Sequence, residues 1–470
     1  MQSSAKSFKI NSKRAIADPK LQDALGRLSA GFPARRRAAL ERLPEFERLR
    51  IDARRIKDHS LEHLDFYLER FEAKVREAGG RVHWASDGAA AREIILAICR
   101  AAGGRAVTTV TTVTKGKSMI AEEIALNEHL QRNGVRVVET DLGEYVLQLR
   151  GEPPSHIIAP AIHLSKAQIT ETFRQKHTNL DPARRLDEPR QILDEARAVL
   201  RRDFLAADVG ITGANLLIAE TGSVVVVTNE GNGDLTMTLP RVHVVIASIE
   251  KVVPTLEDAT TILRLLARSA TGQDMAVYTT FATGPKRRAD SDGPDEFHVV
   301  LLDNKRTEML GGPYNAMLRC IRCAACLNHC PVYKAIGGHA YGWVYPGPMG
   351  AVLTPHLLGP GEADDLPAAS TLCGKCAEVC PVAIPLPDLL RQRRQERFEA
   401  GRGSWLNRFA IKTWARVARM PVLYRILSGL AVGLLKYFSS FSGSWTRTSG
   451  FPPPGQGRTF MKQFKSGKTK

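Results

Sequence analysis

Seven of the eight cysteines in this 470-residue chain fall into two short runs with related spacing. The first run contains Cys320, Cys323, Cys326 and Cys330 and is followed by Pro331, a C-x2-C-x2-C-x3-C-P pattern. The second run contains Cys373, Cys376 and Cys380 and is followed by Pro381. When the runs are aligned on their terminal Cys-Pro, Ser370 stands where the first cysteine would be. Thiolates at this spacing are typical ligands of two iron–sulfur clusters, which transfer single electrons.

The spacing also predicts which cysteines bind which cluster. In two-cluster proteins of this type, the fourth cysteine of each run binds the cluster of the other run. This rule assigns Cys320, Cys323, Cys326 and Cys380 to cluster 1, and Cys330, Cys373 and Cys376 to cluster 2. Cluster 1 then has four thiolates and is a 4Fe–4S cluster. Cluster 2 has three thiolates, so it is either a 3Fe–4S cluster or a 4Fe–4S cluster whose fourth iron binds Ser370, another residue or solvent.

Zinc and disulfides explain the cysteines less well. Structural zinc sites favour four ligands arranged as paired C-x2-C units, and seven cysteines with two Cys-Pro endings do not fit that arrangement. Disulfides are rare in the reducing cytosol, where we expect this protein because its first residues form no apolar signal segment. The eighth cysteine, Cys99, lies in the apolar segment 94–99, and we interpret it as an inert buried thiol.

The chain carries no recognisable motif for a two-electron cofactor. The nearest nucleotide-binding pattern begins at Gly231 and Gly233 but has Thr236 in place of the third glycine. The segment 111–118 ends in Gly-Lys-Ser but lacks the first glycine of a P-loop. Because a dehydrogenation removes two electrons, either a partner subunit performs that step or this chain does so without a known signature.

The length predicts two to four domains. We expect a helical N-terminal segment over residues 1–80, including an amphipathic helix from His59 to Ala78. Residues 81–296 alternate strand and helix patterns, which favours a mostly parallel α/β sheet. Residues 297–395 hold the cysteines and form a mainly helical, ferredoxin-like domain, in which the Gly- and Pro-rich stretch Gly337–Gly361 is predicted to be a loop. Residues 396–470 form a basic helical region with a disordered tail.

Individual elements of the α/β region can also be predicted. A helix capped by Ser118 extends to Asn133, with Gly134 as its stop. Strands are expected where β-branched residues cluster. These strands are Val107–Val113, Val135–Val138, Asn215–Ala219, Ser223–Thr228 and Val242–Ile249.

Two turns of this region are candidates for a substrate pocket. They are Glu220-Thr221-Gly222 and the loop containing Asn229 and Glu230, with Gly231 and Asn232. Both follow predicted strands, where α/β folds bind ligands. The alternative is that these are ordinary turn residues, since Gly and Asn tolerate positive φ.

The positive charge is concentrated at the C-terminus. The chain has a net charge of +17, and residues 391–470 hold 17 Lys and Arg but two acidic residues, Glu396 and Glu399. Nucleic-acid binding is unlikely because this segment has no recognition motif or aromatic platform. Aromatic and basic residues alternate along Trp405–Met420, which favours an interfacial helix on an anionic membrane surface. Docking of a partner subunit, and a solvated tail, remain alternatives.

The order of these parts resembles the bacterial lactate-utilisation protein B family. The resemblance rests on the segments Ile211–Asn232 and Lys115–Glu123 together with the seven-cysteine double motif, and it covers essentially the whole chain. It implies a LUD domain whose fold is similar to the sugar-isomerase and CoA-transferase sheet family. The family's cluster ligands correspond to the seven motif cysteines, and serine at position 370 is also expected in this family.

The resemblance further implies a function. Such proteins act with two companion subunits, one with more cysteine-rich cluster motifs and one with a lone LUD domain. Together they oxidise L-lactate to pyruvate and pass the electrons to respiration, so a membrane or quinone-linked acceptor is expected. A second hypothesis is a cluster-bearing metabolite sensor or general electron carrier whose LUD domain binds a ligand. The two hypotheses differ in whether lactate, with the partners present, reduces the clusters.

Overall fold

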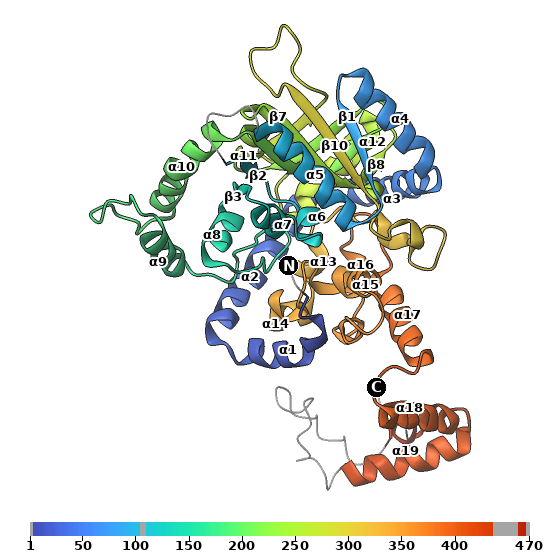
Figure 1. Cartoon of the computed structure of the whole chain (residues 1–470). Coiled ribbons are helices and arrows are strands. Elements are labelled where there is room, and N and C mark those ends of the chain that lie inside the picture. The colour runs from blue at the N-terminus through green and yellow to red at the C-terminus, as the bar shows by residue number, and fades with distance from the viewer. Residues whose placement is uncertain (1–2, 104–109, 436–458, 467–470) are drawn as a thin grey trace. The chain divides into compact units, whose positions relative to one another are not determined.

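The computed structural model describes residues 3–103, 110–435 and 459–466 (Figure 1). Within it the chain divides into two units, Met1–Arg394 and Gln395–Lys470, which are described separately. The first unit contains a parallel sheet, the helices around it and both cysteine runs.

A six-stranded parallel sheet forms the centre of the first unit, with strand order β1-β10-β7-β4-β2-β3. The strands are β1 (Arg81–Ala85), β2 (Thr112–Lys115), β3 (Arg136–Glu139), β4 (Val209–Gly213), β7 (Val242–Ser248) and β10 (Glu296–Leu302). This confirms the predicted parallel α/β sheet. The predicted strand Val107–Val113 lies partly outside the described residues, and β10 extends the sheet beyond residue 296, where we had placed the end of the α/β domain.

Both faces of this sheet are covered, which explains its nearly continuous apolar strands. On β7, Val244 and Ile246 pack on one face beneath α5 (Gly88–Gly103), α6 (Met119–Glu123) and α7 (Leu126–Arg132). Val245 and Ala247 point to the opposite face, towards α4 (Leu64–Glu77) and a second sheet. That sheet has the order β8-β5-β6-β9. Its strands are β5 (Leu216–Ile218), β6 (Ser223–Thr228), β8 (Val252–Val253) and β9 (Tyr278–Ala282).

Two predicted helices are interrupted. The helix expected from Ser118 to Asn133 begins as predicted, since Ser118 Oγ accepts a hydrogen bond from Ala121 N (3.2 Å). It then breaks at Ala125, whose φ of 53° lies in the left-handed region. Likewise, the helix expected over His59–Ala78 is divided at His63 between α3 (Phe46–Glu62) and α4.

The remaining helices surround the sheets and form the cluster region. Before the first strand lie η1 (Ala5–Ser7), α1 (Phe8–Ala17) and α2 (Pro19–Glu41). Beside the sheets lie α8 (Leu142–Arg150), α9 (Lys166–Lys176), α10 (Pro189–Ala206), α11 (Asn232–Thr238), η2 (Ile249–Lys251) and α12 (Leu256–Ala270). The cluster region contains η3 (Thr307–Met309), η4 (Asn315–Arg319), α13 (Ala325–Asn328), α14 (Pro331–Ile336), η5 (His339–Tyr341), α15 (Gly347–Leu358), η6 (Leu366–Ala368), α16 (Lys375–Glu378) and α17 (Leu386–Glu399).

One helix was missed altogether, because Gly337–Gly361 was predicted to be a loop and instead contains α15. Pro348 stands in its first turn, where proline favours a helix start. The helix is buried on nearly all sides, so it lacks the polar face that reveals a helix in a sequence. It packs in one apolar core with the N-terminal helices, α12 and the cysteine segments.

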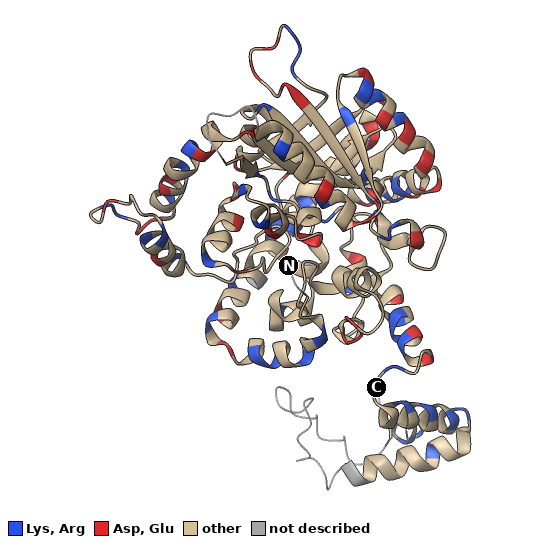
Figure 2. Ribbon diagram, in the orientation of Figure 1, with Lys and Arg blue, Asp and Glu red and all other residues tan. Residues whose placement is uncertain are grey.

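The second unit contains α18 (Trp405–Ala418), α19 (Pro421–Leu435) and α20 (Phe460–Lys465). Lysine and arginine, but no acidic residue, occur on α18 and α19 (Figure 2). None of the helices in the described part of the chain combines the length and apolarity that crossing a membrane requires.

Candidate iron–sulfur site and the adjoining cavity

The two cysteine runs share one backbone conformation. Arg322 and Ala324 have positive φ values of 59° and 62°, and Leu372 and Gly374, at the matching positions of the second run, have 55° and 84°. Each run then enters a four-residue helix, α13 or α16. Left-handed backbone is uncommon outside glycine, so its recurrence at matching positions shows that the two runs form the same kind of loop. In this alignment Ser370 occupies the position of Cys320.

Four cysteines from both runs surround one small cavity. Cys320, Cys323 and Cys326 from the first run and Cys380 from the second line a cavity of about 20 Å³ with apolar neighbours such as Met349. These are the four residues that the spacing rule groups together for cluster 1. All four are free thiols, so the structure brings four potential thiolate ligands to one enclosed point.

The other three cysteines form a second group. Burial raises the pKa of Cys376 to about 12, and the negative charges of Cys330 and Cys373 contribute to the increase because these two thiolates lie nearby. Cys330 and Cys376 are buried, whereas Cys373 is exposed. This is the grouping predicted for cluster 2, and it has one surface-facing ligand.

Burial and hydrogen bonding suit these thiols to metal binding. Burial raises the pKa values of Cys323 and Cys326 well above their usual range, and raises that of Cys380 to about 11. Backbone N–H groups nevertheless point at the sulfurs: Tyr333 N donates to Cys330 Sγ (3.5 Å) and Ile384 N to Cys380 Sγ (3.4 Å). Such donors favour the thiolate form, which is the form of cysteine that binds metals. The donor set therefore fits iron–sulfur clusters.

Ser370 is already engaged in a local turn. Its Oγ accepts a hydrogen bond from Leu372 N (3.1 Å), and its backbone carbonyl accepts one from Arg394 Nη2 (2.7 Å). Cys99, in contrast, lies in the apolar core beneath the sheet, where burial raises its pKa to about 12. It is a buried thiol, as predicted, and lies apart from the other seven.

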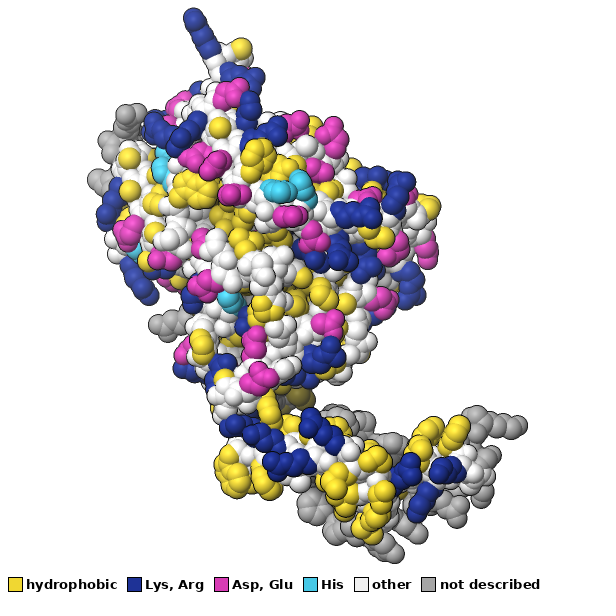
Figure 3. All heavy atoms as spheres, turned by 90° about the vertical axis from the view of Figure 1, so that its right-hand side faces the viewer, with side chains coloured by type: hydrophobic (Ala, Val, Ile, Leu, Met, Phe, Trp, Pro, Cys, Tyr) yellow, Lys and Arg dark blue, Asp and Glu magenta, His cyan; other side chains and the backbone are white. Residues whose placement is uncertain are grey.

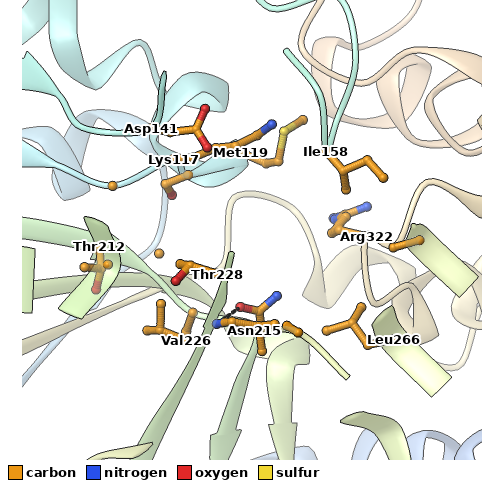
Figure 4. Close-up of a pocket in the computed structure, with 18 of the residues that line it drawn as sticks. Lys117, Met119, Asp141, Ile158, Thr212, Asn215, Val226, Thr228, Leu266 and Arg322 are labelled. Atoms are coloured by element: carbon orange, nitrogen blue, oxygen red, sulfur yellow. Dashed lines mark hydrogen bonds between the residues drawn. The ribbon is translucent and has the colours of Figure 1, made fainter. Parts of the chain in front are cut away.

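A larger cavity, about 270 Å³ in volume, adjoins the first cysteine group. One wall is formed by the segments that follow β2, β3 and β4, with the end of β6 beside them, and another by α12 and the first cysteine run, including Cys323 (Figure 4). Carboxyl ends of parallel strands are where α/β sheets usually bind ligands. The cavity therefore lies between the sheet and the cysteine segment.

The predicted pocket residues divide between two places. Asn229 and Glu230 line this cavity, whereas Glu220, Thr221 and Gly222 do not. Glu220, Thr221 and Gly222 form the turn before β6, where Glu220 Oε2 accepts a hydrogen bond from Leu256 N (3.1 Å). Asn229 and Glu230 follow the other end of β6. A six-residue strand is roughly 20 Å long, so the two turns cannot share one small cavity.

Sequence reasoning missed several polar residues of the cavity. These are Lys117, Asp141, Asn215, Thr228, Lys251 and Arg322. Lys117 and Asp141 directly follow β2 and β3. Ligands usually bind at the carboxyl ends of parallel strands. This rule identifies Lys117 and Asp141 when it is applied to β2 and β3, whereas the predicted turns follow β5 and β6. Arg322 could not be found in this way, since it comes from the cysteine run.

The charged groups of the cavity have unusual environments. Glu230 is an exposed residue, but its carboxyl group is largely buried. This burial, together with the negative charge of the neighbouring Asp141, raises the pKa of Glu230 to about 7. Burial likewise raises the pKa of Glu144, behind Lys117, to about 8. Burial lowers the pKa of Lys251 to about 8, and its Nζ donates a hydrogen bond to the carbonyl of Ala214.

A buried ionic network connects this cavity with the cluster region. Arg306, which precedes the first cysteine run, pairs with Glu123 of α6 and with Glu250 of η2. Glu250 also pairs with Arg322 (3.4 Å), whose guanidinium lies over the Tyr345 ring, 4.7 Å from its centroid. The two cations outweigh burial and lower the pKa of Glu250 to about 2. The network holds Arg322 in place beside the two cysteines that flank it.

Comparisons with known proteins agree with this architecture. Residues 68–302 match the LUD domain, and residues 316–384 match the 4Fe–4S dicluster domain. The chain is 42% identical to "Lactate utilization protein B" of Bacillus licheniformis, over 90% of this chain and 89% of that one. It is 41% identical to the protein of the same name from Bacillus subtilis, over 96% of this chain and 94% of that one. Among solved structures, a duf162 family protein from Deinococcus radiodurans matches 51% of this chain and 98% of its own, at 16% identity and a TM-score of 0.27.

Proposed function

Because this chain belongs to the lactate utilization protein B family, we propose that it is the iron–sulfur electron-transfer subunit of a complex that oxidises L-lactate to pyruvate. The electrons would pass on to respiration. The observation that carries the proposal is the convergence of Cys320, Cys323, Cys326 and Cys380 on one enclosed cavity. Four thiols at one enclosed point suit an iron–sulfur cluster, which transfers single electrons.

The chain's own residues would hold two clusters. Cys320, Cys323, Cys326 and Cys380 would bind cluster 1, and Cys330, Cys373 and Cys376 would bind cluster 2, with Ser370 or solvent at the remaining position. A bound iron–sulfur cluster supplies one-electron transfer. The backbone N–H groups of Tyr333 and Ile384 stabilise negative charge on the ligand sulfurs. The apolar core around α15 excludes water from the first group.

The proposal includes two companion subunits, one rich in cysteine and one with a lone LUD domain. Oxidation of L-lactate releases two electrons and two protons, whereas each cluster accepts one electron. If the subunits act together, a companion subunit would supply the acceptor for the second electron. This part of the proposal rests on the family alone.

We also propose that the C-terminal unit attaches to an anionic membrane surface. Large apolar side chains on α18 and α19 are exposed, among them Trp405 (71%), Phe409 (63%) and Trp414 (62%). Basic side chains lie among them (Figure 3). Helices with exposed aromatic and basic residues suit the interface of an anionic bilayer. Attachment would bring an electron donor close to a respiratory acceptor.

Electron paramagnetic resonance of anaerobically purified protein tests the redox proposal. Spectra would be recorded as isolated, after dithionite, and after L-lactate with both companion subunits. We expect two cluster signals that lactate reduces in the presence of the companions. Clusters that respond to dithionite but never to lactate would contradict the lactate assignment and favour a metabolite sensor or general electron carrier.

Vesicle sedimentation tests the membrane proposal. We expect the full chain to bind vesicles containing phosphatidylglycerol but not vesicles of phosphatidylcholine alone. The double variant Arg408→Glu/Lys412→Glu should lose binding, whereas Arg287→Glu/Arg288→Glu, on an exposed loop of the first unit, should retain it. Loss of companion-subunit binding in the first variant, with no vesicle binding by the wild type, would show that this surface docks a subunit instead.

A further inference from the structure

Three buried polar side-chain atoms on residues that line the large cavity have no hydrogen-bond partner within the described residues. They are Lys117 Nζ, Thr228 Oγ1 and Arg322 Nε. Within the described residues, Lys117 Nζ forms an ion pair with Glu144 Oε1. The two atoms are 3.9 Å apart, which is too far for a hydrogen bond. Buried polar groups are nearly always paired in folded proteins. Unpaired groups on residues from two strand ends and from the first cysteine run, all lining one cavity, therefore point to a missing ligand.

We infer that this cavity binds a small 2-hydroxy- or 2-oxo-carboxylate, with Lys117 pairing with its carboxylate and Thr228 bonding to one of its oxygens. The inference rests on the proposed function, since it locates the substrate class of that function within this chain. Lys117 and Thr228 come from the ends of two strands on one wall of the cavity, and Arg322 comes from the wall that includes the first cysteine run (Figure 4). A ligand that contacts all three residues would lie against the segment that carries Cys323.

The charges of the cavity favour an anion over a neutral ligand. Burial raises the pKa of Glu144, whose Oε1 lies 3.9 Å from Lys117 Nζ, to about 8, so Glu144 is largely protonated at neutral pH. The charge of Lys117 is then not neutralised by this neighbour. Arg322 and Lys251 add two further cations to the lining, although Arg322 is shared with Glu250 and Asp141 adds a carboxylate. A carboxylate ligand would pair with Lys117 in the way that buried charges require.

The size and lining restrict the ligand further. A volume of about 270 Å³ lies near the lower limit of ordinary small-molecule pockets and accommodates a three- or four-carbon acid. Met119 lies beside Asp141, whereas Ile158 and Leu266 line the part of the cavity that lies away from Asp141 (Figure 4). Ile158 and Leu266 would contact the hydrocarbon end of the acid, while the polar groups bind its oxygens.

Isothermal titration calorimetry of the anaerobic holoprotein, without companion subunits, tests this inference. The probes are pyruvate, L-lactate, the neutral analogue lactamide and inorganic phosphate. We expect pyruvate and lactate to bind, and lactamide and phosphate to bind far more weakly. Lys117→Met should raise the Kd for pyruvate about tenfold or more, as expected when a charged hydrogen bond is lost, and Thr228→Val should raise it several-fold. The exposed lysine variant Lys13→Met should match the wild type.

Iron content and the cluster spectrum, measured on each variant, separate this inference from the proposed function. If lactate with companions reduces the clusters but neither Lys117→Met nor Thr228→Val alters pyruvate binding, the cavity assignment is wrong and the function stands. If pyruvate binding depends on both residues but lactate never reduces the clusters, the cavity assignment holds and the function fails. Tighter binding of phosphate than of pyruvate would overturn the ligand class. Should Lys117→Met lose its clusters on purification, Thr228→Val alone decides the outcome.

Discussion

Arg306 Nη2 lies 2.7 Å from Glu123 Oε2, and both side chains are almost completely buried. Arg306 precedes the first cysteine run, whereas Glu123 ends α6 of the LUD domain. The Arg306 guanidinium also contacts Glu250, and Tyr345 donates a hydrogen bond to Glu123. One buried ionic network therefore connects the sheet that lines the large cavity with the segment that carries the cysteines.

Removing the central cation of this network should strongly destabilise the first unit. Arg306→Met would leave the carboxylates of Glu123 and Glu250 buried with fewer cationic partners, and breaking a buried pair in this way typically costs about 3–5 kcal/mol. Urea denaturation of the anaerobic protein would measure the loss. Arg288→Met, an exposed arginine, should be within about 0.5 kcal/mol of the wild type. Equal stability of the two variants would show that the network contributes little.

Binding of the carboxylate should weaken as pH rises. The pKa of Glu230 is raised to about 7 by burial and by Asp141, with the Leu142 N–H and Lys117 acting in the opposite direction. Below this value the carboxyl is neutral. Above it, ionisation adds a negative charge beside the cavity and repels an anion. We therefore expect the Kd for pyruvate to rise between pH 6 and 8, with its midpoint near pH 7.

Two variants test the origin of that pH dependence. Glu230→Gln cannot ionise, so its Kd should rise much less than that of the wild type between pH 6 and 7, below the pKa values of about 8 of Glu144 and Lys251. Glu171→Gln, on the exposed surface of α9, should keep the wild-type profile. A profile that is unchanged in Glu230→Gln would assign the titration to another group.

The crossed grouping of cysteines predicts which cluster each substitution affects. Cys380→Ala, in the second run, should alter the same resonance signal as Cys323→Ala, in the first, because both residues line the small cavity. Cys373→Ala should instead alter the other signal. Iron analysis and electron paramagnetic resonance of the purified variants provide the comparison. If Cys380→Ala altered the same signal as Cys373→Ala, the crossed arrangement would be wrong.

Supplying the missing thiol should complete the second ligand set. Ser370 occupies the backbone position that matches Cys320, so Ser370→Cys places a fourth sulfur where the pattern requires one. We expect higher iron content per chain, and loss of any oxidised-state signal near g = 2 that marks a three-iron cluster. Ser404→Cys, at the N-terminal end of α18, is a control that should change neither measurement. An unchanged spectrum in Ser370→Cys would mean that position 370 does not face the cluster.

Sequence alone determined the cysteine chemistry because its signal is local. Spacings of three residues, as between Cys320, Cys323 and Cys326, and of four, as between Cys326 and Cys330, fix short loops whose backbone repeats in both runs. The strands β2, β3 and β7 of the parallel sheet overlap predicted strands, since β-branched residues concentrate in them, whereas β1, β4 and β10 were not predicted. The buried helix α15 was not predicted either, because a helix covered on all sides has no polar periodicity to detect.

The large cavity was decided by tertiary structure. Lys117, Thr228 and Arg322 lie more than 90 residues apart in sequence, and no local pattern relates them. They meet because the strand order places the ends of β2 and β4 side by side, with the end of β6 nearby, and because the core shared with α12 packs the first cysteine run against them. Local spacing specifies a ligand set within one loop, whereas a pocket built from distant strand ends exists only once the chain has folded.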